Sequence, residues 1–140
     1  MASVLIGMGS NIEPELNLTL AAKALREMFE GANFSAVYHS AAIGMDGADF
    51  LNACCSVESE FSATLIRARL KALEDLQGRD RSEGSWRPRT LDLDMLMYDG
   101  LVVDDELYKY AHAYVPAAEL VAIDLPDDTV NAVTLVELRL

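Results

Sequence analysis

The sequence predicts an α+β fold, in which an antiparallel sheet is covered by two amphipathic helices. Two segments, residues 18–29 and 65–76, repeat apolar side chains at spacings of three and four, the pattern of a helix with one buried face. Four shorter apolar segments give the order strand, helix, strand, strand, helix, strand. A length of 140 residues fits one domain, and we expect residues 1–140 to form a single one.

The first half of the chain is expected to contain a strand, a helix and a second strand. Residues 4–6 are an apolar run followed by glycines, which indicates a buried strand that ends in a turn. Pro14 suits the first turn of the following helix, because an amide donor has no partner there, and Gly31 is a natural end. Residues 34–38 alternate between two faces and predict the second strand.

The second half is expected to contain two strands with a helix between them. Residues 50–57 predict the third strand. Ser62 can cap the second helix by accepting a hydrogen bond from a backbone amide, and Gly78 closes that helix. Residues 91–98 predict the fourth strand, and the Asp-Gly pair at 99–100 is a strong signal for a tight turn.

This order of elements is the ferredoxin-like βαββαβ arrangement, an antiparallel sheet with its helices on one face. The residues after the tight turn form a C-terminal extension. In this extension we expect a short helix near 117–122 and a last strand within 130–140. Many unrelated functions use this fold, so the function has to be inferred from individual residues.

Composition and charge restrict the function. The chain has 23 acidic residues against 11 Lys and Arg, and a net charge of −12 disfavours binding to long nucleic acids or to an anionic membrane. No apolar run is long enough to span a bilayer, and the N-terminus does not look like a signal peptide. The adjacent Cys54 and Cys55 are expected to be free thiols on opposite faces of a strand. We therefore expect a cytoplasmic protein in a reducing compartment.

A pair of carboxylates on the fourth expected strand is the first candidate site. Asp92 and Asp94 are two residues apart, so both project from one face, roughly 7 Å apart along the strand. Two like charges this close repel each other unless a cation lies between them. Carboxylate oxygens suit Mg²⁺, which also takes waters and substrate phosphates as ligands. Taken alone, the same pair can equally be an exposed polar face of a strand.

Four arginines precede this pair in an otherwise acidic chain, at Arg79, Arg81, Arg87 and Arg89. Arginine contacts phosphate groups through two parallel hydrogen bonds. An arginine-containing loop followed by two carboxylates suits a magnesium nucleotide, and it indicates phosphoryl or pyrophosphoryl transfer. Taken alone, the arginines can be surface ion pairs of little energy. The acidic run at 104–106 is interpreted as solvated charge.

The residues from Gly78 to Asp94 read GRDRSEGSWRPRTLDLD. This run resembles the signature of the 6-hydroxymethyl-7,8-dihydropterin pyrophosphokinases, a family of folate biosynthesis. The resemblance covers nearly the whole chain. Further residues that stand where the family has matching ones are Gly9-Ser10-Asn11, Phe50-Leu51-Asn52, Glu74 and His112.

The resemblance implies a ferredoxin-like fold and transfer of the β,γ-diphosphate of ATP to the pterin hydroxymethyl group, with AMP as the other product. Asp92 and Asp94 would hold two Mg²⁺ ions that bridge the ATP phosphates, and Arg79 and Arg89 would act on the same phosphates in catalysis. The residues implied in ATP binding are Glu74, Arg79, Arg81, Trp86, Arg89 and His112. The residues implied in pterin binding are Gly9, Ser40, Ile43, Phe50 and Asn52.

Two alternative functions stay open. Residues 82–85 carry no basic side chain where the family commonly has them, and Leu120 stands where the family has an aromatic residue. A diverged paralogue that binds pterin or nucleotide with little or no transfer fits these changes. An RNA-binding ferredoxin-like module is opposed by the net charge. The expected partners are therefore ATP and a pterin, and neither nucleic acid nor a membrane. The protein itself is expected to be a monomer or a weak homodimer.

Overall fold

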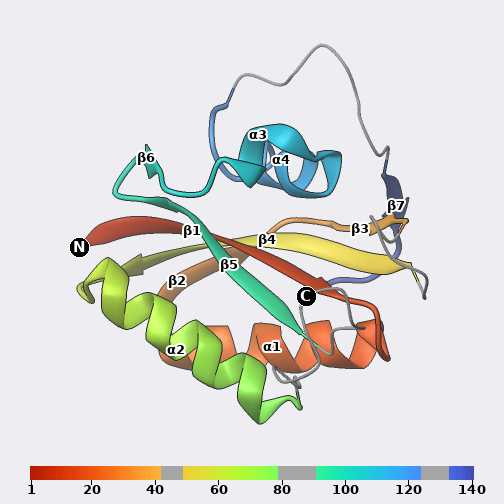
Figure 1. Cartoon of the computed structure of the whole chain (residues 1–140), viewed down its shortest axis with the longest axis horizontal. Helices are drawn as coiled ribbons and strands as arrows, with labels where there is room; N and C mark the ends of the chain where they lie inside the picture. The colour runs from red at the N-terminus through yellow and green to blue at the C-terminus, as the bar shows by residue number, and fades with distance from the viewer. Residues whose placement is uncertain (42–48, 79–90, 124–132) are drawn as a thin grey trace.

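The computed structural model describes residues 1–41, 49–78, 91–123 and 133–140 (Figure 1). These residues form seven strands and four helices. In chain order the elements are β1 (Ala2–Ser10), α1 (Pro14–Met28), β2 (Glu30–Phe34), β3 (Val37–Ser40), β4 (Phe50–Ser59), α2 (Ala63–Leu76), β5 (Asp92–Tyr98), β6 (Leu101–Val102), α3 (Glu106–Lys109), α4 (Ala111–Ala117) and β7 (Thr134–Val136).

The strands form one open antiparallel sheet in the order β6-β5-β1-β4-β3-β7, with β2 also paired to β4. Figure 1 shows α1 and α2 packed on one face of the sheet and the short helices α3 and α4 on the other. The α+β fold and the ferredoxin-like order are thereby confirmed. The two long helices share one face as expected, and the C-terminal extension covers the opposite face.

The sequence signals for the two long helices act as predicted. Pro14 is the first residue of α1, and Leu18 and Leu25 are fully buried on its inner side. The Oγ atom of Ser62 accepts a hydrogen bond from the amide of Leu65 at 3.2 Å, which caps the N-terminus of α2. The helix α1 ends at Met28, before Gly31, because Phe29 is already extended and leads into β2.

The prediction of one strand over residues 34–38 was wrong, because β2 ends at Phe34 and β3 begins at Val37. The Oγ atom of Ser35 accepts a hydrogen bond from the amide of Cys54 at 2.8 Å. The amide of Ala36 donates to Glu119 Oε1 at 3.1 Å instead of to a neighbouring strand. Both β2 and β3 still pair with β4, at its opposite ends.

Two apolar cores lie on the two sides of the sheet. The larger one joins the sheet to α1 and α2, and the smaller one lies under α3 and α4. Cys54 belongs to the smaller core and Cys55 to the larger, and both thiols are buried and free. Their placement on opposite faces confirms the expectation from strand periodicity.

The C-terminal extension differs from the expectation in its details. The short helix expected at 117–122 was misplaced, because α4 already ends at Ala117, where only turns follow. Leu107 and Tyr114 are buried against the sheet, so the apolar residues that anchor this layer come earlier than expected. The last strand is shorter than expected: β7 makes three residue pairs with β3. No helix in the described ranges is long and apolar enough to cross a membrane.

Candidate active site

The register of the sheet brings the two carboxylates and the polar residue of β4 into one row. Asp92 of β5 lies opposite Gly9 of β1, and Gly9 lies opposite Asn52 of β4. Directly opposite residues of antiparallel strands project from the same face. Asp94 follows on this face, opposite Gly7. The site therefore spans three adjacent strands, with glycines between its acidic and its amide side.

Gly9, at the centre of this row, has no side chain and so leaves space between the acidic side and the amide side. A Cβ atom on Gly9 would lie 3.4 Å from Asn52 Oδ1 and 3.7 Å from the ring of Phe50. Both side chains therefore border the space above Gly9. A larger residue at this position would occupy the space through which a ligand on β4 can reach the carboxylates on β5.

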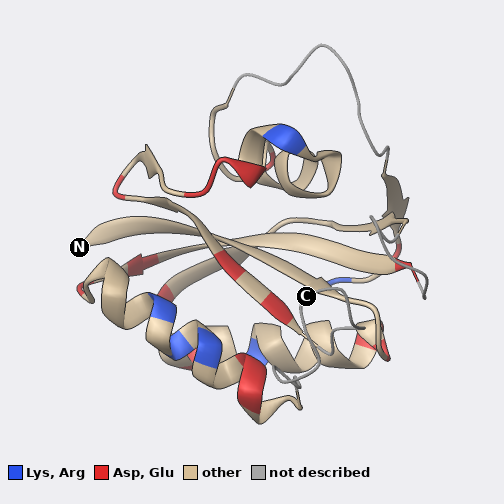
Figure 2. Cartoon of the chain, in the orientation of Figure 1, with Lys and Arg blue, Asp and Glu red and all other residues tan. Residues whose placement is uncertain are grey.

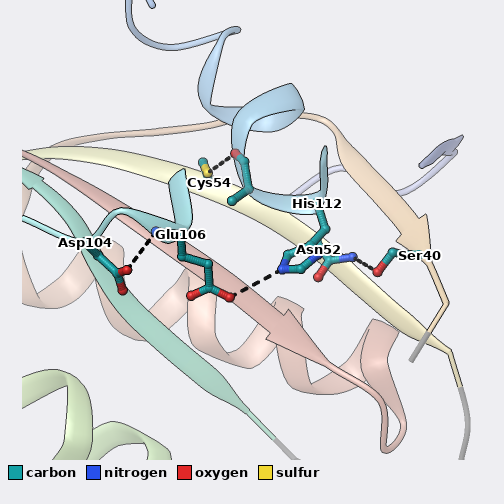
Figure 3. A network of polar contacts seen from close by, with 7 residues as sticks. Ser40, Asn52, Cys54, Asp104, Glu106 and His112 are labelled. Carbon is teal, nitrogen blue, oxygen red and sulfur yellow. Dashed lines mark hydrogen bonds and ion pairs between the residues drawn. The ribbon is translucent and has the colours of Figure 1, made fainter. Parts of the chain in front are cut away.

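The amide of Asn52 is held in a fixed orientation. Its Nδ2 atom donates hydrogen bonds to Ser40 Oγ at 2.7 Å and to the carbonyl of Tyr38 at 3.2 Å (Figure 3). Asn52 is only 5% exposed and Ser40 is buried. Because both donors of the amide are directed to β3, its oxygen lies beside Gly9 and faces the row. This arrangement can accept a hydrogen bond from a flat polar ligand.

The acidic side of the row carries more negative charge than the two aspartates alone. The pKa of Asp94 is raised from 3.8 to about 8, first by burial and then by neighbouring carboxylates. The carboxylates that raise it are those of Asp92, Glu106, Asp104 and Glu74, in this order. A divalent cation would relieve this repulsion.

The donor set fits a hard cation that shares its ligands with a substrate. No group of three or more His, Cys, Asp or Glu side chains in the described part of the chain is arranged to hold a metal by itself. Mg²⁺ is bound in many proteins by one or two carboxylates together with substrate phosphates and waters. Asp92 and Asp94 supply two such carboxylates on one face of β5.

Glu74 connects α2 to the strand that carries the aspartates. It is 2% exposed, and its Oε2 atom accepts a hydrogen bond from the amide of Leu93 at 2.7 Å. A cavity of about 410 Å³ lies next to this contact, between α2, β5 and the chain after β6. Arg67 and Lys71 of α2 line it together with Asp92 and Asp94 of β5. Figure 2 shows basic positions along α2 and acidic positions along β5. The cavity therefore combines two cations with the carboxylates, as a phosphorylated ligand requires.

His112 projects from the helical layer above the same face. Its Nε2 atom lies 3.6 Å from Glu106 Oε1 (Figure 3). Its ring stacks on Tyr110 with 5.2 Å between the ring centroids. Asp104 Oδ1 accepts a hydrogen bond from the amide of Glu106 at 3.0 Å. The interpretation of 104–106 as solvated charge holds for the exposed Asp105 and was wrong for Asp104 and Glu106, which face the site.

The structure thus brings together the predicted site residues that it describes. Asp92, Asp94, Gly9, Asn52 and Phe50 share the row, while Ser40, Glu74 and His112 border it. Predicted site residues that lie outside the described residues are Ile43, Arg79, Arg81, Trp86 and Arg89.

Sequence reasoning missed five residues at the site, namely Arg67, Lys71, Asp104, Glu106 and Tyr110. The two cations are spaced by four residues on α2 and share a helix face with Glu74. That spacing was a signal that could have found them. Glu106 and Tyr110 carry no such signal, because their position depends on how α3 and α4 pack on the sheet.

Comparison with known proteins gives one consistent family. Residues 5–133 match the family model of 7,8-dihydro-6-hydroxymethylpterin-pyrophosphokinase. A 2-amino-4-hydroxy-6-hydroxymethyldihydropteridine pyrophosphokinase of Haemophilus influenzae is 32% identical over 129 residues, which cover 89% of this chain and 80% of the relative. The enzymes of the same name from Aquifex aeolicus and Pseudomonas putida are 31% and 32% identical, covering 81% and 80% of this chain and 72% and 95% of the relatives.

The match covers the whole region in which the site residues lie, from β1 to the end of the helical layer. The chain belongs to the 7,8-dihydro-6-hydroxymethylpterin-pyrophosphokinase family.

Proposed function

We propose that this chain transfers the β,γ-diphosphate of ATP to the hydroxymethyl group of 6-hydroxymethyl-7,8-dihydropterin in a Mg²⁺-dependent reaction. The family and the shared name of its relatives support this reaction, and they favour it over a paralogue that only binds its ligands. The structural observation that carries the proposal is the row from Asp92 across Gly9 to Asn52. It offers an acidic site for a metal and a polar pocket for the acceptor on one continuous surface.

The pterin would lie on the Asn52 side of this row. Its pyrimidine edge presents N–H donors, which match the fixed amide oxygen of Asn52. The half-buried ring of Phe50 borders the same space and can stack on the flat pterin. Gly9 leaves the path open for the hydroxymethyl group to point toward β5. Ser40 and Ile43 complete the proposed pocket, the latter on the basis of the sequence resemblance alone.

The nucleotide would lie on the acidic side, along β5. Lys71 and Arg67 line the cavity there and can neutralise part of the phosphate charge. Glu74 shapes the cavity, and His112 reaches the site from above. The proposed contacts from the arginine-containing loop rest on the sequence pattern alone, and they involve Arg79, Arg81, Trp86 and Arg89.

Asp92 and Asp94 would hold the metal, with two Mg²⁺ ions as the proposed number. The crowding of carboxylates that raises the pKa of Asp94 is the observation that supports a cation at this place. When bound, Mg²⁺ offsets the negative charge of the phosphates and so lowers the barrier to attack by a neutral hydroxyl group.

The protein's own contribution to the reaction is orientation. The hydroxymethyl oxygen forms a bond to the β-phosphorus of ATP, the bond from this phosphorus to the oxygen shared with the α-phosphate breaks, and AMP leaves. The hydroxyl proton passes to solvent. Asn52 and Phe50 hold the acceptor, while Arg67, Lys71 and His112 hold the donor, so that attack occurs in line across Gly9.

The proposal extends to the setting in which the protein works. Two buried free thiols, Cys54 and Cys55, are compatible with a reducing compartment such as the cytoplasm. The net charge of −12 favours small-molecule partners over nucleic acid or an anionic membrane. We propose a single domain spanning residues 1–140 that acts as a monomer or a weak homodimer.

The proposal is tested by measuring AMP release from ATP, Mg²⁺ and the pterin with wild-type protein and three variants. Asp92→Asn and Asp94→Asn each remove one proposed metal ligand and are expected to lower the rate at least about a hundredfold. Asp99→Asn makes the same change in the exposed turn after β5 and should leave the rate unchanged. Pterin-dependent AMP release that persists in both ligand variants would refute the proposed metal site, and none from the wild type would refute the activity.

A further inference from the structure

Glu106 and Tyr110 flank the imidazole of His112 in the layer that covers the proposed catalytic face of the sheet. Glu106 is the first residue of α3, Tyr110 separates α3 from α4, and His112 lies in the first turn of α4. Figure 3 shows Glu106 and His112 pointing toward each other above β1 and β4. The three side chains therefore come from seven consecutive residues that fold over the site.

The backbone fixes the relative positions of these three residues. The amide of Tyr110 donates to the carbonyl of Glu106 at 3.4 Å, and the carbonyl of Tyr110 accepts from the amides of Ala113 and Tyr114 at 2.9 and 3.0 Å. Leu107 is fully buried and anchors the segment in the smaller core. The orientation of the imidazole is consequently decided by side-chain contacts on a rigid backbone.

Within the described ranges, the imidazole contacts a ring and a carboxylate and makes no hydrogen bond. The planes of the Tyr110 and His112 rings lie 9° from parallel. The distance of 3.6 Å from Nε2 to Glu106 Oε1 suits an ion pair but exceeds a hydrogen bond. Nδ1 is buried and has no hydrogen-bond partner among the described residues. A histidine that served only the fold would satisfy its buried nitrogen atoms.

We infer that Glu106 and Tyr110 are positioning residues for nucleotide binding, which act by holding the imidazole of His112. Tyr110 fixes the plane of the ring, and the carboxylate of Glu106 fixes the edge that carries Nε2. The gap of 3.6 Å lets this N–H group donate to a phosphate oxygen while the carboxylate stays beside it. This inference rests on the proposed function, since it assigns His112 to the nucleotide.

Whether neutralising Glu106 weakens or tightens nucleotide binding distinguishes a positioning role from plain electrostatic repulsion. Glu106 lies close enough to the aspartates to raise the pKa of Asp94, so its carboxylate repels a bound polyphosphate. If repulsion were its whole effect, neutralising it would tighten nucleotide binding. Positioning of His112 predicts the opposite, because the imidazole loses the charge that orients it.

The first test is calorimetric binding of a non-hydrolysable ATP analogue with Mg²⁺, which requires no pterin turnover. Glu106→Gln is expected to raise Kd about tenfold, the loss of one charge-assisted contact. The matched control is Asp105→Asn, the same change of charge at the exposed neighbour, with less than a twofold effect expected. In a His112→Asn background, Glu106→Gln should no longer weaken binding, because only the relief of its repulsion of the polyphosphate remains. Unchanged or tighter binding by Glu106→Gln in the wild-type background would overturn the inference.

The second test concerns the ring stack. Tyr110→Ala should raise Kd about fivefold, whereas Tyr110→Phe keeps the stack and should stay within twofold of wild type. Tyr108→Ala, at the exposed tyrosine two residues earlier, is the matched control. Equal losses in the Phe and Ala variants would overturn the role of stacking. AMP formation by the wild type, measured separately, shows whether the proposed function itself holds: its absence with normal analogue binding refutes the activity and not the positioning.

Discussion

The buried carboxylate of Glu74 accepts a hydrogen bond from the backbone amide of Leu93, the residue between the two aspartates of β5. This contact joins α2 to an edge of the sheet where, among the described residues, β6 pairs only with Met97 and Tyr98 and no strand other than β1 pairs with the first residues of β5. A side chain thus takes the place of a strand at the point where the proposed metal ligands lie. The position of the aspartates therefore depends on a residue of a distant helix.

We predict that Glu74→Ala destabilises the protein by about 2 kcal/mol, because it leaves the buried amide of Leu93 without an acceptor. Glu74→Gln keeps an acceptor oxygen and should cost less than half as much. Urea unfolding of the two variants and the wild type measures the difference. As a control, Asp75→Ala changes an exposed carboxylate of the same helix. Equal stability of Glu74→Ala and wild type would show that the contact contributes nothing to the fold.

Asp94 gives a prediction on the pH dependence of stability. Its pKa is raised from 3.8 to about 8 in the folded protein, by burial and then by the carboxylates around it. Between these two values the folded state binds more protons at this group than the unfolded state. The contribution of Asp94 to stability without metal should therefore fall as the pH rises from about 4 to 8.

Asp94→Asn removes this unfavourable charge, so we expect it to raise Tm without metal at pH 8 by about 3 °C or more while it abolishes activity. Thermal unfolding of the variant and the wild type is measured at both pH values, and the difference in Tm expected at pH 8 should disappear at pH 5. Adding Mg²⁺ should stabilise the wild type and not the variant. A lower Tm for the variant at pH 8 would contradict the repulsion among these carboxylates.

Gly9 separates the pterin and metal sides of the site, which makes its substitution a test of geometry. A methyl group there would be in ordinary contact with Asn52 and Phe50, so Gly9→Ala should fold with nearly unchanged stability. The same methyl group narrows the proposed pterin path, and KM for the pterin should rise about tenfold with little change in KM for ATP. Steady-state kinetics with each substrate varied in turn measures the two constants. Equal increases in both would point to a general distortion of the sheet instead.

The contact between Tyr38 and Glu119 leads to a prediction on the pKa of the Tyr38 hydroxyl group. The Tyr38 hydroxyl donates to Glu119 Oε2 at 2.6 Å, and burial together with this carboxylate raises the pKa of Tyr38 to about 12. The difference in phenolate absorbance between wild type and Tyr38→Phe isolates this residue. Glu119→Gln should lower the pKa of Tyr38 back toward 10. In the wild type, the contribution of Tyr38 to the free energy of unfolding should be lost as the pH rises from 10 to 12. An unchanged titration in Glu119→Gln would contradict the contact.

Local patterns in the sequence predicted the long helices and the placement of the aspartates. The two-residue period put Asp92 and Asp94 on one face of β5, and the Ser62 cap marked the start of α2. These features depend on residues close to one another in the chain. Family resemblance alone linked Gly9 and Asn52 to the aspartates, because the register between strands is not visible in any local pattern.

The features that could not be predicted depend on contacts between distant residues. The interruption between β2 and β3 involves Glu119, which follows Ala36 by 83 positions. The role of Glu106 arises from the packing of α3 on the sheet, so the acidic run around it looked like solvated charge. In both places tertiary contacts outweigh the local pattern.

The identity of the products tests the central claim most directly. Wild-type protein is incubated with ATP, Mg²⁺ and 6-hydroxymethyl-7,8-dihydropterin, and the products are separated and identified by mass spectrometry. We predict equal amounts of AMP and the pterin diphosphate, formed only when all three components are present. ADP with a pterin monophosphate, or unchanged ATP and pterin, would contradict the proposed pyrophosphoryl transfer.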